Sequence, residues 1–376
     1  MAKKLIVISL AVAAILLTMQ CQIETEPKND YQKQQKSIIT IGVILPLTGP
    51  SFDGGQNVKR GIELALEELN HQYLKYHYNL VFEDSQYDPK TGVSATKKLI
   101  GVDHVKYIIG PQSSSVALAM APVVEENKVI LMSTGAQSDT ISDAGDYIFR
   151  VQTNTKQEAE FFAEYIHDQT DHEKIDLLVM NTAYANSLID AFVRQGIYFN
   201  QIEKFDSKET DFRTHLNRIK NCGSKYLLLG ATRDTGGLIL KQAKEMGLDI
   251  KFFATSPIAG EELIKTADAA ADGLIYPYPY DVESEESNIK SFKQKYFERY
   301  GSSNDLYAAN GYDAMKILSS CIEQVGDDVA KVKSCLYGIQ DYHGASGTFT
   351  FDENGDAIKD FIIMTIKDGK FTRYTE

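Results

Sequence analysis

Gly110-Pro111-Gln112-Ser113-Ser114-Ser115 is the segment with the strongest chemical character in the sequence. It follows a short apolar run and precedes a helical pattern, so it lies where a strand ends and a helix begins. A helix N-terminus presents free N–H groups and a partial positive charge, and serine hydroxyls add further donors. The segment therefore predicts a cradle for a carboxylate. The alternative is a serine that only caps the helix.

A second polar segment, Ser133-Thr134-Gly135-Ala136-Gln137-Ser138, follows the next predicted strand. Parallel strands end at one edge of their sheet, and open α/β sheets bind ligands at that edge. We therefore expect both segments to border one site.

The elements that position these segments alternate along most of the chain. Short apolar runs predict strands, and amphipathic patterns between them predict helices. The strands are expected at 38–45, 78–83, 105–109, 129–132, 147–151, 175–180, 226–229, 252–254 and 273–276. Helices are expected at 56–69, 88–100, 115–127, 155–167, 188–196, 212–220, 236–247, 288–300, 307–325 and 328–337. The rhythm restarts near residue 154, which predicts an α/β fold of two doubly wound lobes with parallel sheets.

Two alternating runs near the C-terminus, 347–351 and 360–366, predict a hairpin. The acidic residues between them resemble a calcium loop only superficially. The EF-hand loop requires Gly and Glu where this chain has Ala357 and Ile363. Asn354-Gly355 instead predicts a tight turn.

Composition excludes several classes of protein. The 376 residues include 39 Lys+Arg and 52 Asp+Glu, a formal net charge of -13, which lacks the electrostatic footprint of a nucleic-acid binder. Apolar residues make up 43% and charged residues 24%, as in ordinary globular domains. No Cys or His pair has the spacing of a zinc site, and the sequence has no nucleophile elbow, phosphate-binding loop or HExxH motif. We therefore expect no catalytic residues, no metal and no cofactor.

The N-terminal sequence is typical of an export signal. A basic start, an apolar run over 5–17 and then Cys21 predict a signal peptide over 1–20 and a flexible tether over 21–37. Cys21 stands where lipoprotein processing would leave an acylated N-terminus, although Thr18 and Gln20 match that processing poorly. We expect an exported, lipid-anchored protein of the periplasm or cell envelope, with ordinary secretion as the alternative.

The remaining cysteines are Cys222, Cys321 and Cys335. An exported chain meets an oxidising compartment. Cys321 and Cys335 lie on two successive helical patterns, which could face each other. We expect a disulfide between them and a free Cys222; the alternative is a pair of small buried thiols.

Taken together, several stretches resemble the branched-chain amino-acid-binding proteins of bacterial ABC transporters, which have the type I periplasmic-binding fold. They run in family order across nearly the whole chain after the signal. They include IGVILPLTGPSFDGGQNVKRGIELALEELN (41–70), YDPKTGVSATKKLI (87–100), IIGPQSSSVALAMAPVVEENKVILMSTGAQSDTI (108–141), FRVQTN (149–154), AYANSLIDAF (183–192), DFRTHLNRIK (211–220), LKQAKEMGL (240–248), ADGLIYPYPY (271–280), YAANGYDAMKIL (307–318) and GTFTFDENGD (347–356).

This resemblance implies a two-lobed clamp with a small carboxylate-bearing ligand between the lobes and a membrane permease as partner. It implies hinge crossings near Thr153, Tyr280 and Ala345. Lobe one would be 38–153 plus 281–345, and lobe two 154–280 plus 346–376. An envelope regulator that uses the same fold to contact another protein is the alternative.

The resemblance also implies a set of ligand-binding residues. Ser114 matches the serine that contacts the ligand carboxylate in the family, and Ser115 is adjacent to it. Backbone groups of Gly135 would help. Gln137 stands where the family has a hydroxyl, so Ser138 could substitute.

The resemblance assigns the other walls of the site as well. Tyr184 would close over the ligand from lobe two, with a surface tyrosine as the alternative. Tyr307, and more loosely Phe52 in the loop after the first strand, would line the side-chain pocket.

Three positions on lobe two depart from the family. Ser256 stands where amino-acid binders commonly carry an acid for the ligand ammonium, although Asp281 could supply one. Thr232 matches a tyrosine of the cleft. Its neighbour Arg233 could meet an anionic group, or be a surface charge near Asp234.

Overall fold

The computed structural model describes residues 36–281 and 283–375. The fold below is that of the unit that begins at Ile38. The signal peptide and Cys21 lie outside the described residues. Within these residues, no helix has the length and apolar character needed to cross a membrane.

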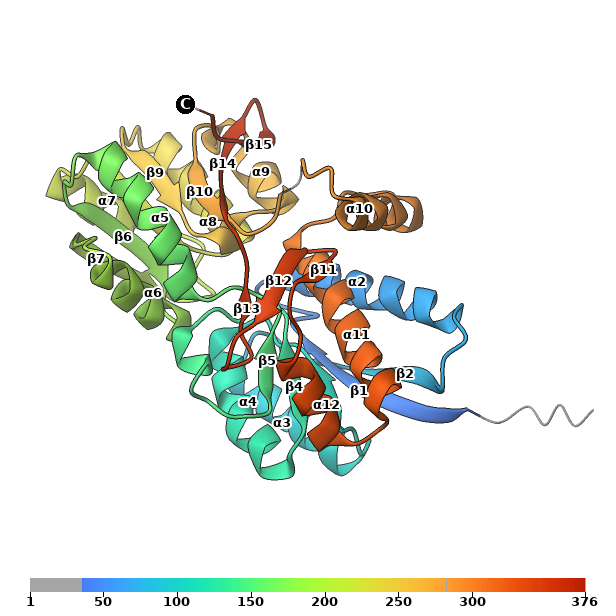
Figure 1. The fold of residues 1–376 in the computed structure, drawn as a ribbon. Coiled ribbons are helices and arrows are strands. Elements are labelled where there is room, and N and C mark those ends of the chain that lie inside the picture. Colours follow the sequence, from blue (N-terminus) through green and yellow to red (C-terminus); the bar gives the residue numbers. More distant parts are fainter. Residues whose placement is uncertain (1–35, 282, 376) are drawn as a thin grey trace, which may run out of the picture. The chain divides into compact units, whose positions relative to one another are not determined.

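The first lobe is built on a five-stranded sheet in the order β2-β1-β3-β4-β5. Its strands β1, β2, β4 and β5 are labelled in Figure 1. Its strands are β1 (Ser37–Leu45), β2 (Tyr76–Asp84), β3 (Tyr107–Ile109), β4 (Ile130–Ser133) and β5 (Ile148–Arg150). The pairs β1/β3, β3/β4 and β4/β5 are parallel. The helices are α2 (Phe52–Asn70), α3 (Pro89–Gly101), α4 (Ser114–Asn127), α10 (Ser287–Tyr300), α11 (Leu306–Val325) and α12 (Val329–Tyr337).

Helices cover both faces of this sheet, and this explains why β1 is apolar along its length. Ile41, Val43 and Leu45 pack in one core cluster with α2 and α11. Ile44 packs in another with α3 and α4. The predicted start of the helix at Asp88 is also confirmed. The Asp88 side chain accepts a hydrogen bond from the N–H of Thr91, as expected of an N-cap residue before Pro89.

The second lobe carries a seven-stranded sheet in the order β15-β14-β10-β9-β8-β6-β7. Its strands are β6 (Ile175–Met180), β7 (Phe199–Phe205), β8 (Tyr226–Gly230), β9 (Lys251–Ala254), β10 (Ile275–Tyr278), β14 (Ile362–Lys367) and β15 (Lys370–Arg373). The helices of this lobe are α5 (Thr155–Thr170), α6 (Ala183–Arg194), α7 (Arg213–Cys222), α8 (Arg233–Glu245) and α9 (Glu261–Ala267). It also has two 3-10 turns, η2 (Ser256–Ile258) and η3 (Asp268–Ala270), and lobe one has one, η1 (Asp139–Ile141). Only β14 and β15 pair antiparallel to their neighbours. The expected doubly wound α/β lobes are confirmed.

One expectation near the C-terminus, the hairpin, is wrong. The run 347–351 pairs with the short strand β13 (Ala357–Ile358) and with β11 (Tyr342–Gly344), and these form a separate sheet with β12 (Gly347–Phe351). The second expected hairpin strand, β14, joins the lobe-two sheet instead. Phe349, Phe351 and Ala357, which fall in the expected lobe two, pack in a core cluster with lobe-one residues such as Val43.

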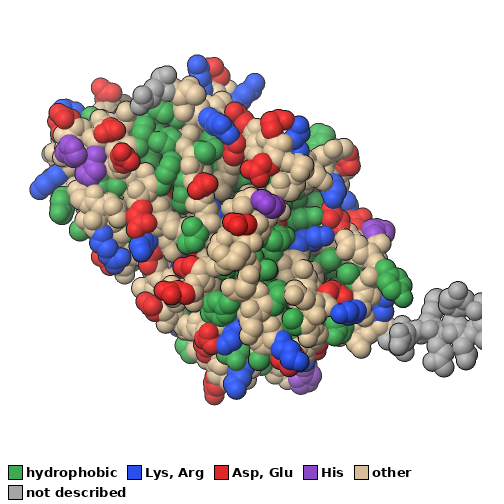
Figure 2. All heavy atoms as spheres, in the orientation of Figure 1, with side chains coloured by type: hydrophobic (Ala, Val, Ile, Leu, Met, Phe, Trp, Pro, Cys, Tyr) green, Lys and Arg blue, Asp and Glu red, His purple; other side chains and the backbone are tan. Residues whose placement is uncertain are grey.

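The surface carries charges of both signs. On the face drawn in Figure 2, acidic and basic side chains are interspersed among polar and apolar ones.

Candidate functional site

A cavity lies where the strands of both lobes end. It encloses about 490 Å³ of space free of protein atoms, including space open to solvent. Its lining residues lie at or after the ends of β1, β2, β3, β4, β6, β8 and β9, except for Tyr307 at the start of α11. They are Ser51, Tyr87, Gln112, Ser114, Gly135, Gln137, Met180, Thr182, Tyr184, Gly230, Ala231, Thr232, Pro257 and Tyr307. The two polar segments singled out in the sequence therefore border one cavity, at the sheet edge where α/β folds bind ligands.

Ser114 is placed as a donor toward this cavity. Its Oγ accepts hydrogen bonds from the backbone N–H groups of Gln137 and Ser138, both at 3.1 Å. Because these bonds occupy both lone pairs of the hydroxyl, its proton remains for an acceptor. Ser114 is also the first residue of α4, so the partial positive charge of that helix lies beside it.

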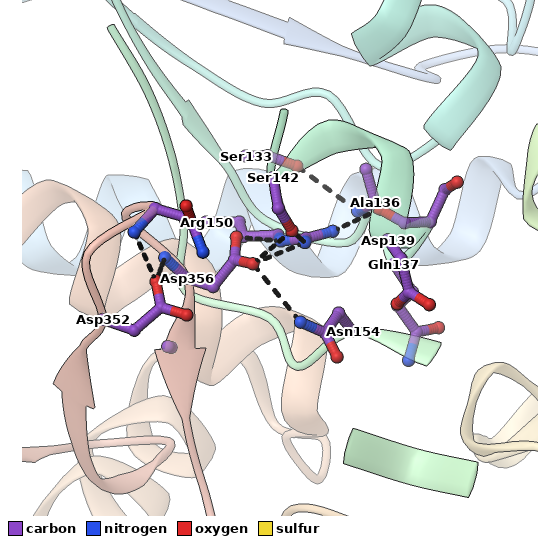
Figure 3. A network of polar contacts seen from close by, with 12 residues as sticks. Ser133, Ala136, Gln137, Asp139, Ser142, Arg150, Asn154, Asp352 and Asp356 are labelled. Atoms are coloured by element: carbon purple, nitrogen blue, oxygen red, sulfur yellow. Dashed lines mark hydrogen bonds and ion pairs between the residues drawn. The ribbon is translucent and has the colours of Figure 1, made fainter. Parts of the chain in front are cut away.

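A buried ion pair holds the 133–138 segment in place (Figure 3). The fully buried guanidinium of Arg150 contacts both carboxylate oxygens of Asp356 and donates to the carbonyl of Ser138 at 2.7 Å. It also donates to Ser142 Oγ at 2.6 Å. This network fixes the loop that orients Ser114 and connects it to Asp356, which precedes β13.

Gln112 borders the cavity, and sequence reasoning did not single it out. Its side-chain oxygen and nitrogen are both buried, and neither has a hydrogen-bond partner among the described residues. A Cβ on Gly135 would lie 3.1 Å from Gln112 Cα, Cβ and Cγ, so the missing side chain at 135 makes room for it. A buried amide without partners in a cavity wall is a group that a ligand can satisfy.

Ser115 and Ser138, both expected at the ligand, do not line the cavity. Ser115 Oγ accepts a hydrogen bond of 3.0 Å from the N–H of Ala183, so it connects α4 to α6 of the other lobe. Ser138 Oγ lies 2.8 Å from Thr140 Oγ1. Each hydroxyl therefore has a hydrogen-bond partner within the protein.

Aromatic side chains form much of the remaining wall. Tyr184 and Tyr307 line it as expected, and Tyr87 does so without having been singled out. The hydroxyl of Tyr184 has no hydrogen-bond partner of standard geometry in the described part of the chain. Phe52 differs from its expectation: it begins α2 and is 48% exposed outside the cavity.

Thr232 lines the cavity at the N-terminus of α8, but its hydroxyl donates to Asp234 Oδ1 at 2.5 Å. Arg233 is not among the residues that line the cavity, and it is buried rather than a surface charge. It is 3% exposed and pairs with Asp305 at 2.6 Å and Asp53 at 3.2 Å, both in lobe one. These acids raise the pKa of Arg233 against the effect of burial, so the guanidinium stays charged.

Ser256 lies behind the cavity wall rather than in it. Its hydroxyl and N–H donate to the carboxylate of Glu158, at 3.1 and 2.6 Å. Glu158 was not predicted, because an acid in the first turn of a helix is ordinarily a solvated residue. Asp281 pairs with the exposed Arg373.

The cysteines are arranged as follows. A disulfide joins Cys321 of α11 to Cys335 of α12, with Cα atoms 5.8 Å apart, and Cys222 is free and exposed. Within the described residues, no group of three or more His, Cys, Asp or Glu side chains could hold a metal ion.

Known proteins resemble this chain over most of its length. A family model described as "Periplasmic binding protein" matches residues 38–370. A Leu/Ile/Val-binding protein homolog 3 of Brucella melitensis is 28% identical over 345 residues, covering 88% of this chain and 92% of that protein.

Solved structures agree. The leucine-binding protein LivK of Thermotoga maritima superimposes with a TM-score of 0.82 at 26% identity, over 90% of this chain and 98% of that one. An R. palustris solute-binding protein in complex with benzoate has a TM-score of 0.83 at 18% identity, over 90% and 95% of the two chains, and shows the fold alone. The chain is thus a non-enzymatic, extracytoplasmic solute-binding protein and belongs to the periplasmic binding protein family.

Proposed function

We propose that this protein captures a small carboxylate-bearing solute, an amino acid or a related organic acid or amide, in the cavity between its lobes. It then delivers the solute to the membrane permease of an ABC importer. The main support for the proposal is the geometry of the Ser114 hydroxyl. It borders the cavity at the start of α4, and two backbone N–H groups occupy both of its lone pairs. Such a hydroxyl donates to an anion and accepts from nothing.

Helix positions support an anionic ligand. The helices α6 and α8 also begin at the cavity, and their N-cap residues, Thr182 and Thr232, line it. Three helix N-termini therefore face one space and favour negative charge there. The lining residues include no Asp or Glu to oppose it.

A ligand screen tests the proposal. Carboxylates and their uncharged amides are compared by thermal shift and calorimetry. A binder at a hundredfold excess over Kd stabilises the protein by ~2.7 kcal/mol. We expect carboxylates to bind and Ser114→Ala to weaken them about tenfold or more, since a hydrogen bond to a charged group contributes ~1.5–3 kcal/mol.

The control is Ser94→Ala, on the exposed face of α3. It leaves the affinity unchanged. Failure of every carboxylate to bind, or equal binding of acids and amides, contradicts the proposal.

We also propose that Cys21 is the acylated mature N-terminus. The basic start, the short apolar run and the polar tether support it. Stable membrane anchoring needs more than one acyl chain, and lipoproteins carry several. Intact mass of the protein isolated from its own membrane tests it, and an unmodified N-terminus downstream of Cys21 contradicts it.

A further inference from the structure

Glu158 is a fully buried carboxylate one layer behind the cavity wall. It lies in the first turn of α5 in lobe two and has no exposed surface. Besides Ser256, it accepts a hydrogen bond of 3.3 Å from Nε2 of Gln137, a lobe-one residue that lines the cavity. The same Nε2 lies 3.0 Å from Ser256 Oγ.

No cation of the described residues forms an ion pair with Glu158. Its partners are neutral hydrogen-bond donors. A buried charge without an opposite charge is costly, and burial raises the pKa of Glu158 to about 7 against the lowering effect of its hydrogen bonds. Structural carboxylates are normally paired, so this one points to a role at the cavity.

The contact decides which end of the Gln137 amide faces the ligand. An ionised carboxylate only accepts hydrogen bonds, so it requires the NH₂ group of Gln137 on its side. The carbonyl oxygen Oε1 is left over, and it receives no hydrogen bond from the described residues. Gln137 therefore presents an acceptor to the cavity, with a negative charge behind it.

We propose that Glu158 is a positioning residue that, through Gln137, makes the cavity select carboxylates that also carry an amine. The inference rests on the proposed function, since it assumes a carboxylate at Ser114. The backbone N–H of Gln137 is 3.1 Å from Ser114 Oγ, so the carboxylate and amine subsites are adjacent. The amine must then be close to the carboxylate in the ligand.

The selection depends on pH. Above about pH 7 Glu158 is ionised and accepts from Gln137 Nε2. Below it, the protonated acid becomes a donor, which allows the amide to turn and present NH₂ to the cavity. The titratable group facing Glu158 is the phenol of Tyr184 on α6, which burial keeps neutral by raising its pKa well above the ordinary value. Ser256 and Gln137, on the other elements in contact, do not titrate.

Calorimetry with matched pairs tests the inference: L-alanine and propanoate, L-leucine and 4-methylpentanoate, L-phenylalanine and 3-phenylpropanoate. For the pairs that bind, we expect the wild type at about pH 8 to favour the amine-bearing member at least tenfold. Glu158→Gln should bring this ratio close to one and change the affinity for the amine-free member less than about threefold. Glu160→Gln, an exposed acid on the same helix, should keep the ratio.

The outcomes separate the two proposals. If none of these carboxylates, nor any in the screen above, binds the wild type, the proposed function fails and this inference with it. If carboxylates bind but Glu158→Gln keeps the ratio, or the wild type prefers the amine-free members, only this inference fails. Should Glu158→Gln not fold, the wild type decides alone: the ratio must fall toward one between about pH 8 and pH 5.5, and a constant ratio overturns the inference.

Discussion

Arg233 and Asp305 form an ion pair of 2.6 Å between the two lobes, directly beside the ligand cavity. Arg233 begins α8 in lobe two, and Asp305 caps α11 in lobe one by accepting from the N–H of Ala308. The guanidinium also lies 4.9 Å from the ring centre of Tyr307, which lines the cavity. Gly260 makes room for it, because a Cβ there would overlap the guanidinium. This contact forms only where the lobes meet.

We therefore predict that Asp305→Asn weakens ligand binding at least tenfold. Asn keeps the helix cap and removes the charge, so the loss falls on lobe closure rather than on folding. Breaking a buried pair costs several kcal/mol when both lobes bury it, whereas an open form would hydrate Arg233. Calorimetry measures the affinity and small-angle scattering the closure. Arg213→Met, which removes an exposed ion pair, is the control, and an unchanged affinity in Asp305→Asn contradicts the prediction.

The disulfide between Cys321 and Cys335 should stabilise the chain. It closes a loop with a sequence separation of 14 between α11 and α12, and the chain-entropy account gives roughly 3 kcal/mol for such a loop. Cys335→Ser should lower the free energy of unfolding by about this amount in urea titration. Cys222→Ser should have no effect, because this thiol is free and exposed. Peptide mapping that finds Cys222 bridged would contradict the assignment.

Much of the fold could be predicted from the sequence, because its strongest signals are local. The parallel strands are short apolar runs, and Asp88 marks its helix start through a contact three residues away. The edge strand β7 was not predicted because its sequence, FNQIEKF, is not a short apolar run: three of its seven side chains are exposed, and the buried ones include Glu203. β14 was assigned to the wrong partner because pairing is a long-range property that an alternating pattern does not encode.

Local signals indicated the part of the cavity wall that follows the strand ends, whereas Tyr307 on α11 was expected only from the family resemblance. Ser114, Gly135 and Gln137 follow strand ends, and all border the cavity. Glu158 and Ser256 are 98 residues apart, and neither position alone suggests a buried contact. Arg233 likewise pairs with Asp305, which is 72 residues away in the sequence. Its neighbour Asp234 therefore gave no indication of this contact.

The buried side chain of Lys359 should make the stability of the protein depend on pH. Lys359 donates to Asn310 Oδ1 at 3.0 Å and Ser346 Oγ at 2.7 Å, and burial lowers its pKa to about 7 although Asp313 raises it. Between about pH 7 and the ordinary lysine value near 10.4, the unfolded chain binds a proton that the folded chain lacks, so stability rises with pH.

Relative to Lys359→Met, the free energy of unfolding of the wild type should thus increase by roughly 1 kcal/mol per pH unit in this window. Urea titrations at about pH 7, 8 and 9 measure the difference. Lys370→Met, at an exposed position on β15, is the control and should show no such slope. A parallel pH dependence of wild type and Lys359→Met would show that Lys359 keeps an ordinary pKa.

Gln112 should show opposite effects on stability and on binding. Both polar atoms of its side chain are buried without a partner in the described part of the chain, and it borders the cavity beside Gly135. An apolar side chain of similar size removes this unsatisfied group, so Gln112→Leu should raise the free energy of unfolding of the ligand-free protein by about 1 kcal/mol. The same change removes a donor and an acceptor from the ligand, so the affinity should fall about tenfold or more. Gln112→Glu should lower the affinity for a carboxylate ligand further, because it places a like charge beside the ligand.

Urea titration and calorimetry on the same samples measure the stability and the affinity, with Gln294→Leu on the exposed face of α10 as the control. A Gln112→Leu protein that is less stable but binds normally would assign this side chain to packing and not to the ligand.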